Sequence, residues 1–138
     1  MRAALSIPAR ANYLADLRTW IDQFVQQGTA DEIVRARVVL AVHEVAANII
    51  EHAYAGHPAG SIAVTAVLTT TQLTVSVDHT GEPCPRAEVP APVFDGSASR
   101  GFGVWITDRA ADDVYRVSGA GGIHSTILVH NLFDRTQP

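Results

Sequence analysis

An apolar segment with three evenly spaced polar side chains is the most constraining feature of this sequence. It runs from Leu40 to Tyr54 and carries Glu44, Asn48 and His52 at intervals of four residues. On an α-helix such positions drift by only about 40° per step, so the three side chains lie along one stripe. A carboxylate, an amide and an imidazole on a buried helix cost free energy unless a partner satisfies them. The segment therefore predicts a buried helix whose polar stripe faces a partner or a ligand.

Two interpretations of the Glu44/Asn48 pair are open. In the first, Asn48 gives an oxygen ligand to Mg²⁺, and Glu44 orients or deprotonates an attacking hydroxyl or water. In the second, the two side chains hydrogen-bond to each other or cap neighbouring backbone. For His52 the pattern favours a packed, hydrogen-bonded histidine over a metal ligand.

Hydrophobic periodicity predicts two helices in the first part of the chain. Apolar residues recur at three- and four-residue steps from Asn12 to Gln27, and a glycine follows. Thr29 and Glu32 have the spacing of a capping box, so a second, long helix is expected over residues 30–54. Because this helix is apolar on more than one face, we expect it to lie deep, with a sheet on one side.

Alternating apolar and polar residues predict the strands. Pro8 stops the first and shortest one, which therefore reads as an edge strand. The next two form a hairpin, and the last two form another across a glycine-rich turn. The expected strands cover residues 3–7, 61–68, 72–78, 113–118 and 123–131.

A long segment rich in Gly, Pro and Ser, residues 80–100, separates the two hairpins. A structureless stretch of that length in a small domain is usually functional. It ends at Gly101 and Gly103, after which residues 104–111 resume helical periodicity. Glycines at a loop–helix junction let backbone N–H groups approach an anion, and Arg100 beside them can make a bidentate phosphate contact. A purely structural role for the glycines is the alternative.

Composition excludes several classes of protein. The 138 residues carry a net charge of −4 without an arginine cluster, so no nucleic-acid partner is expected. A single cysteine, Cys84, excludes an internal disulfide and fits a reducing compartment. No signal peptide and no apolar run of about 18 residues is present, so we expect a cytoplasmic protein without a membrane partner. His43 and Glu44 lack the second histidine of a zinc-protease helix, and no P-loop motif occurs.

The order of these parts resembles the histidine-kinase-like ATPase superfamily, which includes gyrase and the Hsp90 chaperones. Within it, the chain is similar to the anti-sigma-factor serine/threonine kinases of bacteria. The Glu-x-x-x-Asn-x-x-x-His-Ala-Tyr segment is the most specific part of a resemblance that covers nearly the whole chain. It implies the Bergerat-type ATP-binding fold in a single domain, residues 1–138. This fold is an α+β two-layer sandwich with helices on one face of a mixed, mostly antiparallel sheet and the nucleotide pocket between the layers.

The resemblance also implies roles for individual residues. Asn48 would bind Mg²⁺ and Glu44 would activate the attacking hydroxyl. Thr126 or Ser125 would support the adenine, Gly81 would lie beneath it, and the residues from Arg100 to Gly103 would hold the phosphates of ATP. The complete implied ATP-binding set is Asn48, Asp78, His79, Gly81, Arg100, Gly101, Phe102, Gly103 and Thr126.

One position departs from the family pattern. The family places an aspartate two residues before the glycine, where it accepts the adenine amino group, but this chain has His79 there and Asp78 one residue earlier. Because Val77 and His79 share one face of a strand, Asp78 is expected to point away unless a bulge precedes Gly81. Losing a charge-assisted contact to adenine would cost about 1.5–3 kcal/mol.

The resemblance implies a regulatory function and its partners. Such a protein is an anti-sigma regulatory factor that binds a sigma factor, phosphorylates a serine or threonine of a small antagonist protein, and usually forms a homodimer. The alternative is a module of the same fold that switches partners through protein–protein contact alone and has a weak or silent nucleotide site.

Overall fold

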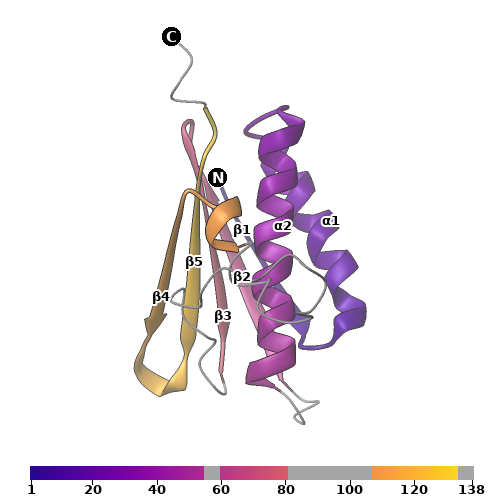
Figure 1. Cartoon of the computed structure of the whole chain (residues 1–138), viewed down its shortest axis with the longest axis vertical. Helices are drawn as coiled ribbons and strands as arrows, with labels where there is room; N and C mark the ends of the chain where they lie inside the picture. The colour runs from indigo at the N-terminus through magenta and orange to yellow at the C-terminus, as the bar shows by residue number, and fades with distance from the viewer. Residues whose placement is uncertain (55–59, 81–106, 134–138) are drawn as a thin grey trace, which may run out of the picture.

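In the computed structural model, which describes residues 1–54, 60–80 and 107–133, two helices cover one face of a five-stranded sheet (Figure 1). The sheet order is β1-β2-β3-β5-β4, and every pairing among these strands is antiparallel. The predicted α+β two-layer sandwich is confirmed, although the described strands include no parallel pair of the kind a mixed sheet would have. The main elements are β1 (Arg2–Pro8), α1 (Leu14–Val25), α2 (Glu32–Asn48), β2 (Ser61–Leu68), β3 (Gln72–His79), β4 (Asp113–Ser118) and β5 (His124–Asn131).

The start of α2 differs from the predicted capping box. The Asp31 side chain accepts hydrogen bonds from the backbone N–H groups of Ile33 and Val34, at 2.9 and 3.3 Å, and is therefore the N-cap. Thr29 instead accepts a bond from the Asp31 N–H at 3.1 Å. An aspartate satisfies the first N–H groups and also places a negative charge at the positive end of the helix, so it competes successfully with the earlier threonine.

The end of this helix also differs from the prediction of one continuous helix over residues 30–54. The α-helical part ends at Asn48, and the next residues form a π-helical turn, η2 (Ile49–Ala53). The Tyr54 N–H donates to the Ile49 carbonyl at 3.2 Å, which closes this wider turn. Single π-turns inside helices are often found at functional sites. Among the described helices, none combines the length and apolarity needed to cross a membrane.

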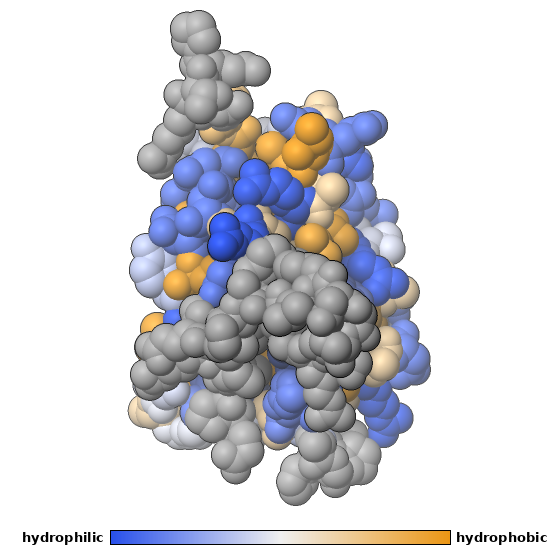
Figure 2. Space-filling view, viewed as in Figure 1, coloured by the Kyte–Doolittle hydropathy of each residue, from blue (hydrophilic) through white to orange (hydrophobic). Residues whose placement is uncertain are grey.

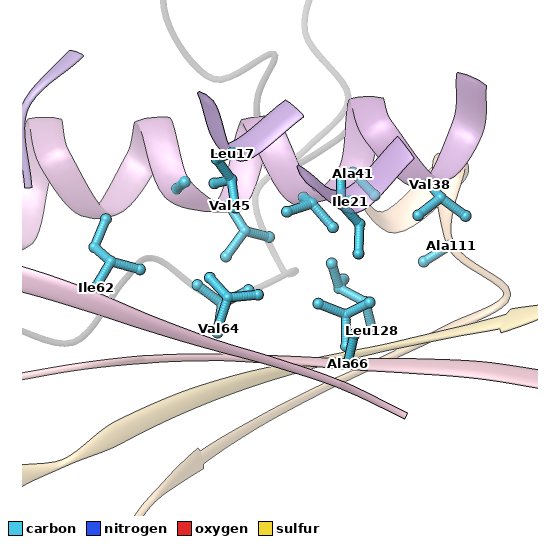
Figure 3. Packing of buried hydrophobic residues seen from close by; sticks show 14 of the residues in the cluster. Leu17, Ile21, Val38, Ala41, Val45, Ile62, Val64, Ala66, Ala111 and Leu128 are labelled. Carbon is cyan, nitrogen blue, oxygen red and sulfur yellow. The ribbon is translucent and has the colours of Figure 1, made fainter. Parts of the chain in front are cut away.

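The core lies between the helices and the sheet, as the strand alternation predicts. Figure 3 shows side chains of both helices pointing at the inward residues of the sheet. Burying one large aliphatic side chain contributes about 1.5–3 kcal/mol, so this contact fixes how α2 lies on the sheet. The side chains labelled in Figure 3 are Leu17, Ile21, Val38, Ala41, Val45, Ile62, Val64, Ala66, Ala111 and Leu128, all of them buried.

A histidine without a described hydrogen-bond partner at one nitrogen is buried in this mainly apolar layer. His130, on the inner face of β5, is 3% exposed, and its Nε2 has no hydrogen-bond partner among the described residues. Burial lowers the pKa of His130 to about 4, and the positive charge of Arg37 acts in the same direction, whereas Asp112 opposes it. The imidazole is therefore neutral at pH 7.

This buried histidine predicts a loss of stability in acid. Because its pKa is lower in the folded than in the unfolded chain, the unfolded chain binds more protons once the pH falls below about 6.5. The linked loss in the free energy of unfolding is about 2 kcal/mol at pH 5. Replacing His130 with leucine is expected to remove this part of the pH dependence. Urea unfolding at pH 7.5 and pH 5 measures it, and equal acid sensitivity of the variant and the unmodified chain would contradict the assignment.

Candidate functional site

Glu44 and Asn48 lie one turn apart near the C-terminal end of α2, and both are half-buried. Neither side chain makes a hydrogen bond or ion pair with the described residues, so the interpretation that they bond to each other or cap nearby backbone is not supported there. Arg37 lies on the same flank of the helix, seven residues before Glu44. Its Nη2 donates to the carbonyl of Arg109 at 3.2 Å, so this flank faces the helical residues 107–110.

The third polar residue of the stripe does not share this environment. His52 is exposed, and its Nε2 lies 3.8 Å from a carboxylate oxygen of Glu51, which is also exposed. The expectation of a packed, hydrogen-bonded histidine is therefore wrong. Because the π-turn η2 takes more residues per turn than an α-helix, it rotates His52 away from the buried side.

The structure confirms the prediction that His79 faces inward and Asp78 faces outward at the C-terminal end of β3. His79 is only 4% exposed and shares the inner face with Val77, whereas Asp78 is half-buried on the outer face. The Asp78 carboxylate accepts a hydrogen bond from Ser76 at 2.9 Å. Regular pairing of β3 with β5 continues to His79, opposite His124, so no bulge in the described strand turns Asp78 inward.

Tyr54 joins the end of the helix to the end of β3, a role that the sequence did not reveal. Its hydroxyl donates to the Ser61 carbonyl at 2.9 Å and accepts from the Thr80 N–H at 2.8 Å. Its ring lies 6.2 Å from the His79 ring, edge to face. Gly60 leaves room for this ring, since a Cβ there would approach it to 2.5 Å. Tyr54 ends the Glu-x-x-x-Asn-x-x-x-His-Ala-Tyr segment, but the local sequence pattern does not predict which residues it contacts.

The neighbouring strand β5 contributes two more side chains at this end of the sheet. Thr126 is 4% exposed on the inner face, whereas Ser125 is half-buried on the outer face, so Thr126 is the one that faces the helical layer. The His124 ring lies 5.3 Å from the His79 ring and bonds through Nδ1 to the Ser118 hydroxyl at 2.8 Å. At this end of the sheet, the inner faces of β3 and β5 therefore present the imidazoles of His79 and His124 and the hydroxyl of Thr126 towards the helical layer that contains Asn48.

Two arginines hold the segment that precedes β4. Arg116, on β4, forms an ion pair with Asp108 at 3.1 Å, and both side chains are about three-quarters buried. Together with the bond from Arg37 to Arg109, this pair fixes residues 107–110 between α2 and the sheet. Polar contacts between different elements leave no signal in hydrophobic periodicity.

Comparison with known families agrees with this geometry. The sequence profile described as "Histidine kinase-like ATPase domain" matches residues 7–128. The chain belongs to the histidine-kinase-like ATPase domain family. No curated protein matches the sequence of this family member.

Solved structures share the fold at low sequence identity. The structure of the RsbU and RsbW domains of Rv1364c from Mycobacterium tuberculosis matches with a TM-score of 0.71 and 22% identity, over 96% of this chain and 32% of that one. This chain therefore spans about a third of that protein's structure. The catalytic domain of the histidine kinase ThkA matches with a TM-score of 0.54 and 16% identity, over 94% and 97% of the two chains. The histidine kinase AdeS of Acinetobacter baumannii gives 0.50 and 11%, over 96% and 68%.

ATP normally binds together with a divalent cation. The described residues contain no group of three or more His, Cys, Asp or Glu side chains that could hold a metal. Mg²⁺ in phosphate sites needs fewer ligands from the protein, because phosphates and water supply the rest. The unbonded amide oxygen of Asn48 fits that requirement. The other expected phosphate and adenine contacts lie outside the described residues; they are Gly81, Arg100, Gly101, Phe102 and Gly103.

Proposed function

We propose that this histidine-kinase-like ATPase domain is an ATP·Mg²⁺-dependent protein serine/threonine kinase that acts as an anti-sigma regulatory factor. It phosphorylates a small antagonist protein, binds a sigma factor, forms a homodimer and works in the cytoplasm. The observation that carries the proposal is that Glu44 and Asn48, two half-buried side chains with oxygen atoms, make no hydrogen bond to the described residues of a member of an ATPase family. The fold match to a structure containing an RsbW domain agrees with the resemblance to anti-sigma-factor kinases.

Each residue has a defined part in this proposal. Asn48 gives an oxygen to Mg²⁺, which neutralises charge on the phosphates when bound. Glu44, one turn away, accepts the proton of the attacking serine or threonine hydroxyl. His79 and Thr126 line the base end, and the segment from Arg100 to Gly103 holds the phosphates. Phosphoryl transfer depends mainly on positioning and charge, so few side chains suffice.

A second function is favoured by one specific observation. His79 occupies the inward position at the end of β3, and the nearest acid, Asp78, faces outward and is bonded to Ser76. A neutral imidazole accepts one hydrogen bond and cannot serve both the adenine amino group and a water as a carboxylate can. The alternative is therefore a partner-switching module of the same fold with a weak or silent nucleotide site.

Transfer to a protein partner tests the kinase function. Proteins captured from a lysate of the source organism on the immobilised chain are incubated with Mg²⁺ and ATP, and phosphoserine and phosphothreonine are located by mass spectrometry. The kinase proposal predicts a modified partner only with the unmodified chain and not with a Glu44→Gln variant. Capture without any Glu44-dependent modification favours the partner-switching alternative.

One substitution at the adenine end of the proposed site, His79→Asp, is expected to raise the affinity for ATP. A His79→Asp variant restores an inward-facing carboxylate beside the Tyr54 ring, so ATP affinity should rise by about 1.5–3 kcal/mol, or tenfold to a hundredfold. Calorimetric titration of ATP measures it, and Asp78→Asn is the matched control because Asp78 faces outward. An unchanged affinity in His79→Asp, or a large loss in Asp78→Asn, would overturn the placement of His79 at the adenine.

A further inference from the structure

A groove of about 660 Å³ runs between α1 and α2 on the side away from the sheet. It is lined from α1 by Arg18 and Asp22, among others, and from α2 by Ala36, Val39 and Leu40. These positions differ from those that both helices bury against the sheet. α1 packs on the side of α2 opposite Glu44 and Asn48, and the groove borders their flank at Leu40, one turn before Glu44.

The floor of this groove is apolar and uncovered. Leu40 is 42% exposed, Ala36 is exposed and Val39 is half-buried. Figure 2 shows hydrophobic surface over the upper part of α2 among hydrophilic residues, and the 73% exposed Ile33 belongs to this helix but lies outside the groove. α2 therefore presents apolar side chains both to the core and to the outside. A helix that is apolar on opposite sides is normally covered on both.

The charges at the groove are not balanced. Asp22 is paired with Arg35 at 3.1 Å, and this hydrogen bond lowers the pKa of the Asp22 carboxyl. Arg18, by contrast, donates from Nη1 to Nδ1 of His43 at 2.9 Å. An imidazole carries no negative charge, so this contact leaves the charge of Arg18 uncompensated. Arg18 has no ion pair with any residue in the described ranges.

We propose that the groove binds an amphipathic helix of a partner protein whose apolar side chains fill the floor and whose carboxylate pairs with Arg18. Helix-in-groove recognition uses apolar anchors spaced three, four and seven residues apart, which suits a floor set between two helices. Arg18, the one uncompensated cation among the described residues that line the groove, selects an acidic helix over a basic one. This docking function goes beyond the proposed kinase activity and does not require a bound nucleotide.

A displayed library of helical peptides, selected on the full chain without nucleotide, tests the proposal. The enriched peptides are expected to share apolar anchors on one face and a glutamate or aspartate beside them. Their affinity should fall by about tenfold or more for both Arg18→Glu and Leu40→Asp. Matched controls on the far face of the sheet are Arg2→Glu and Val117→Asp, both at exposed positions, and these should bind as the unmodified chain does.

Charge reversal makes the test decisive. Selection on the Arg18→Glu variant should enrich peptides with lysine or arginine at the position where the unmodified chain enriches acids. Circular dichroism verifies that each variant is folded. The proposal is overturned if the enriched peptides bind Arg18→Glu and Leu40→Asp as tightly as the unmodified chain, if no peptide is enriched, or if the charge preference does not reverse. None of these outcomes bears on ATP binding, which is measured separately.

Discussion

Replacing Glu44 with glutamine is expected to slow phosphoryl transfer by about 10²–10⁴-fold while leaving the affinity for ATP and Mg²⁺ nearly unchanged. Glutamine keeps the size of the side chain and its hydrogen-bonding capacity but cannot accept the proton of the attacking hydroxyl. Glu44 has no hydrogen-bond or ion-pair partner among the described residues, so the substitution breaks no such contact there. The measurement is single-turnover transfer from labelled ATP to the modified partner protein.

A matched control for this substitution is Glu32→Gln. Glu32 lies in the first turn of the same helix and is exposed, so its replacement changes the net charge equally but far from the site. It should leave transfer intact. Retained transfer in Glu44→Gln would refute the role of Glu44 as a base, whereas loss of ATP binding in that variant would instead indicate a role in holding the nucleotide.

Replacing Asn48 with alanine is expected to remove the dependence of ATP affinity on Mg²⁺. The amide oxygen is the proposed protein ligand of the cation, and losing an interaction that supports a bound metal costs about tenfold to a hundredfold in affinity. Alanine is the best helix former, so the end of α2 should persist. Calorimetric titration of ATP with Mg²⁺ and with EDTA measures the difference.

The rescuing variant for this position is Asn48→Asp. An aspartate keeps an oxygen at the same place and is a preferred Mg²⁺ ligand, so it should restore the Mg²⁺ dependence that alanine removes. If Asn48→Ala binds ATP·Mg²⁺ as tightly as the unmodified chain, the cation is held elsewhere and the assignment of Asn48 is wrong.

The part of the site that the sequence predicted correctly depends on local periodicity. Strand residues alternate with a period of two, so burial of Val75 and Val77 determines that His79 faces inward and Asp78 outward. The same alternation predicted the faces of the β2–β3 hairpin and the α+β sandwich.

The wrong predictions concern positions where two capping residues, or two kinds of helical turn, compete. Thr29 and Glu32 have the spacing of a capping box, but Asp31 forms the cap with a carboxylate. His52 follows a perfect four-residue interval, yet the π-turn η2 rotates it to the surface. A π-turn has no strong sequence signature, so a pattern built on α-helical spacing fails beyond Asn48.

The residues that sequence reasoning missed act through side-chain contacts between different elements. Tyr54 bonds to Ser61 and Thr80, and Arg116 pairs with Asp108, across turns whose path the sequence does not specify. The bonds of Tyr54 hold the end of β3 beside the turn that follows α2, and the Arg116–Asp108 pair holds residues 107–110 on β4. The bonds of Tyr54 become apparent only once the strands are paired.

Calorimetric titration of the full chain with ATP and Mg²⁺ tests the central claim, that a nucleotide binds between α2 and the inner face of the sheet. ATP is expected to bind with a Kd below about 1 mM, and more weakly when Mg²⁺ is removed. Asn48→Ala is expected to abolish the effect of Mg²⁺, and His79→Asp is expected to tighten binding. Absence of binding at millimolar ATP in the presence of Mg²⁺ would contradict the kinase proposal and leave the partner-switching function in its place.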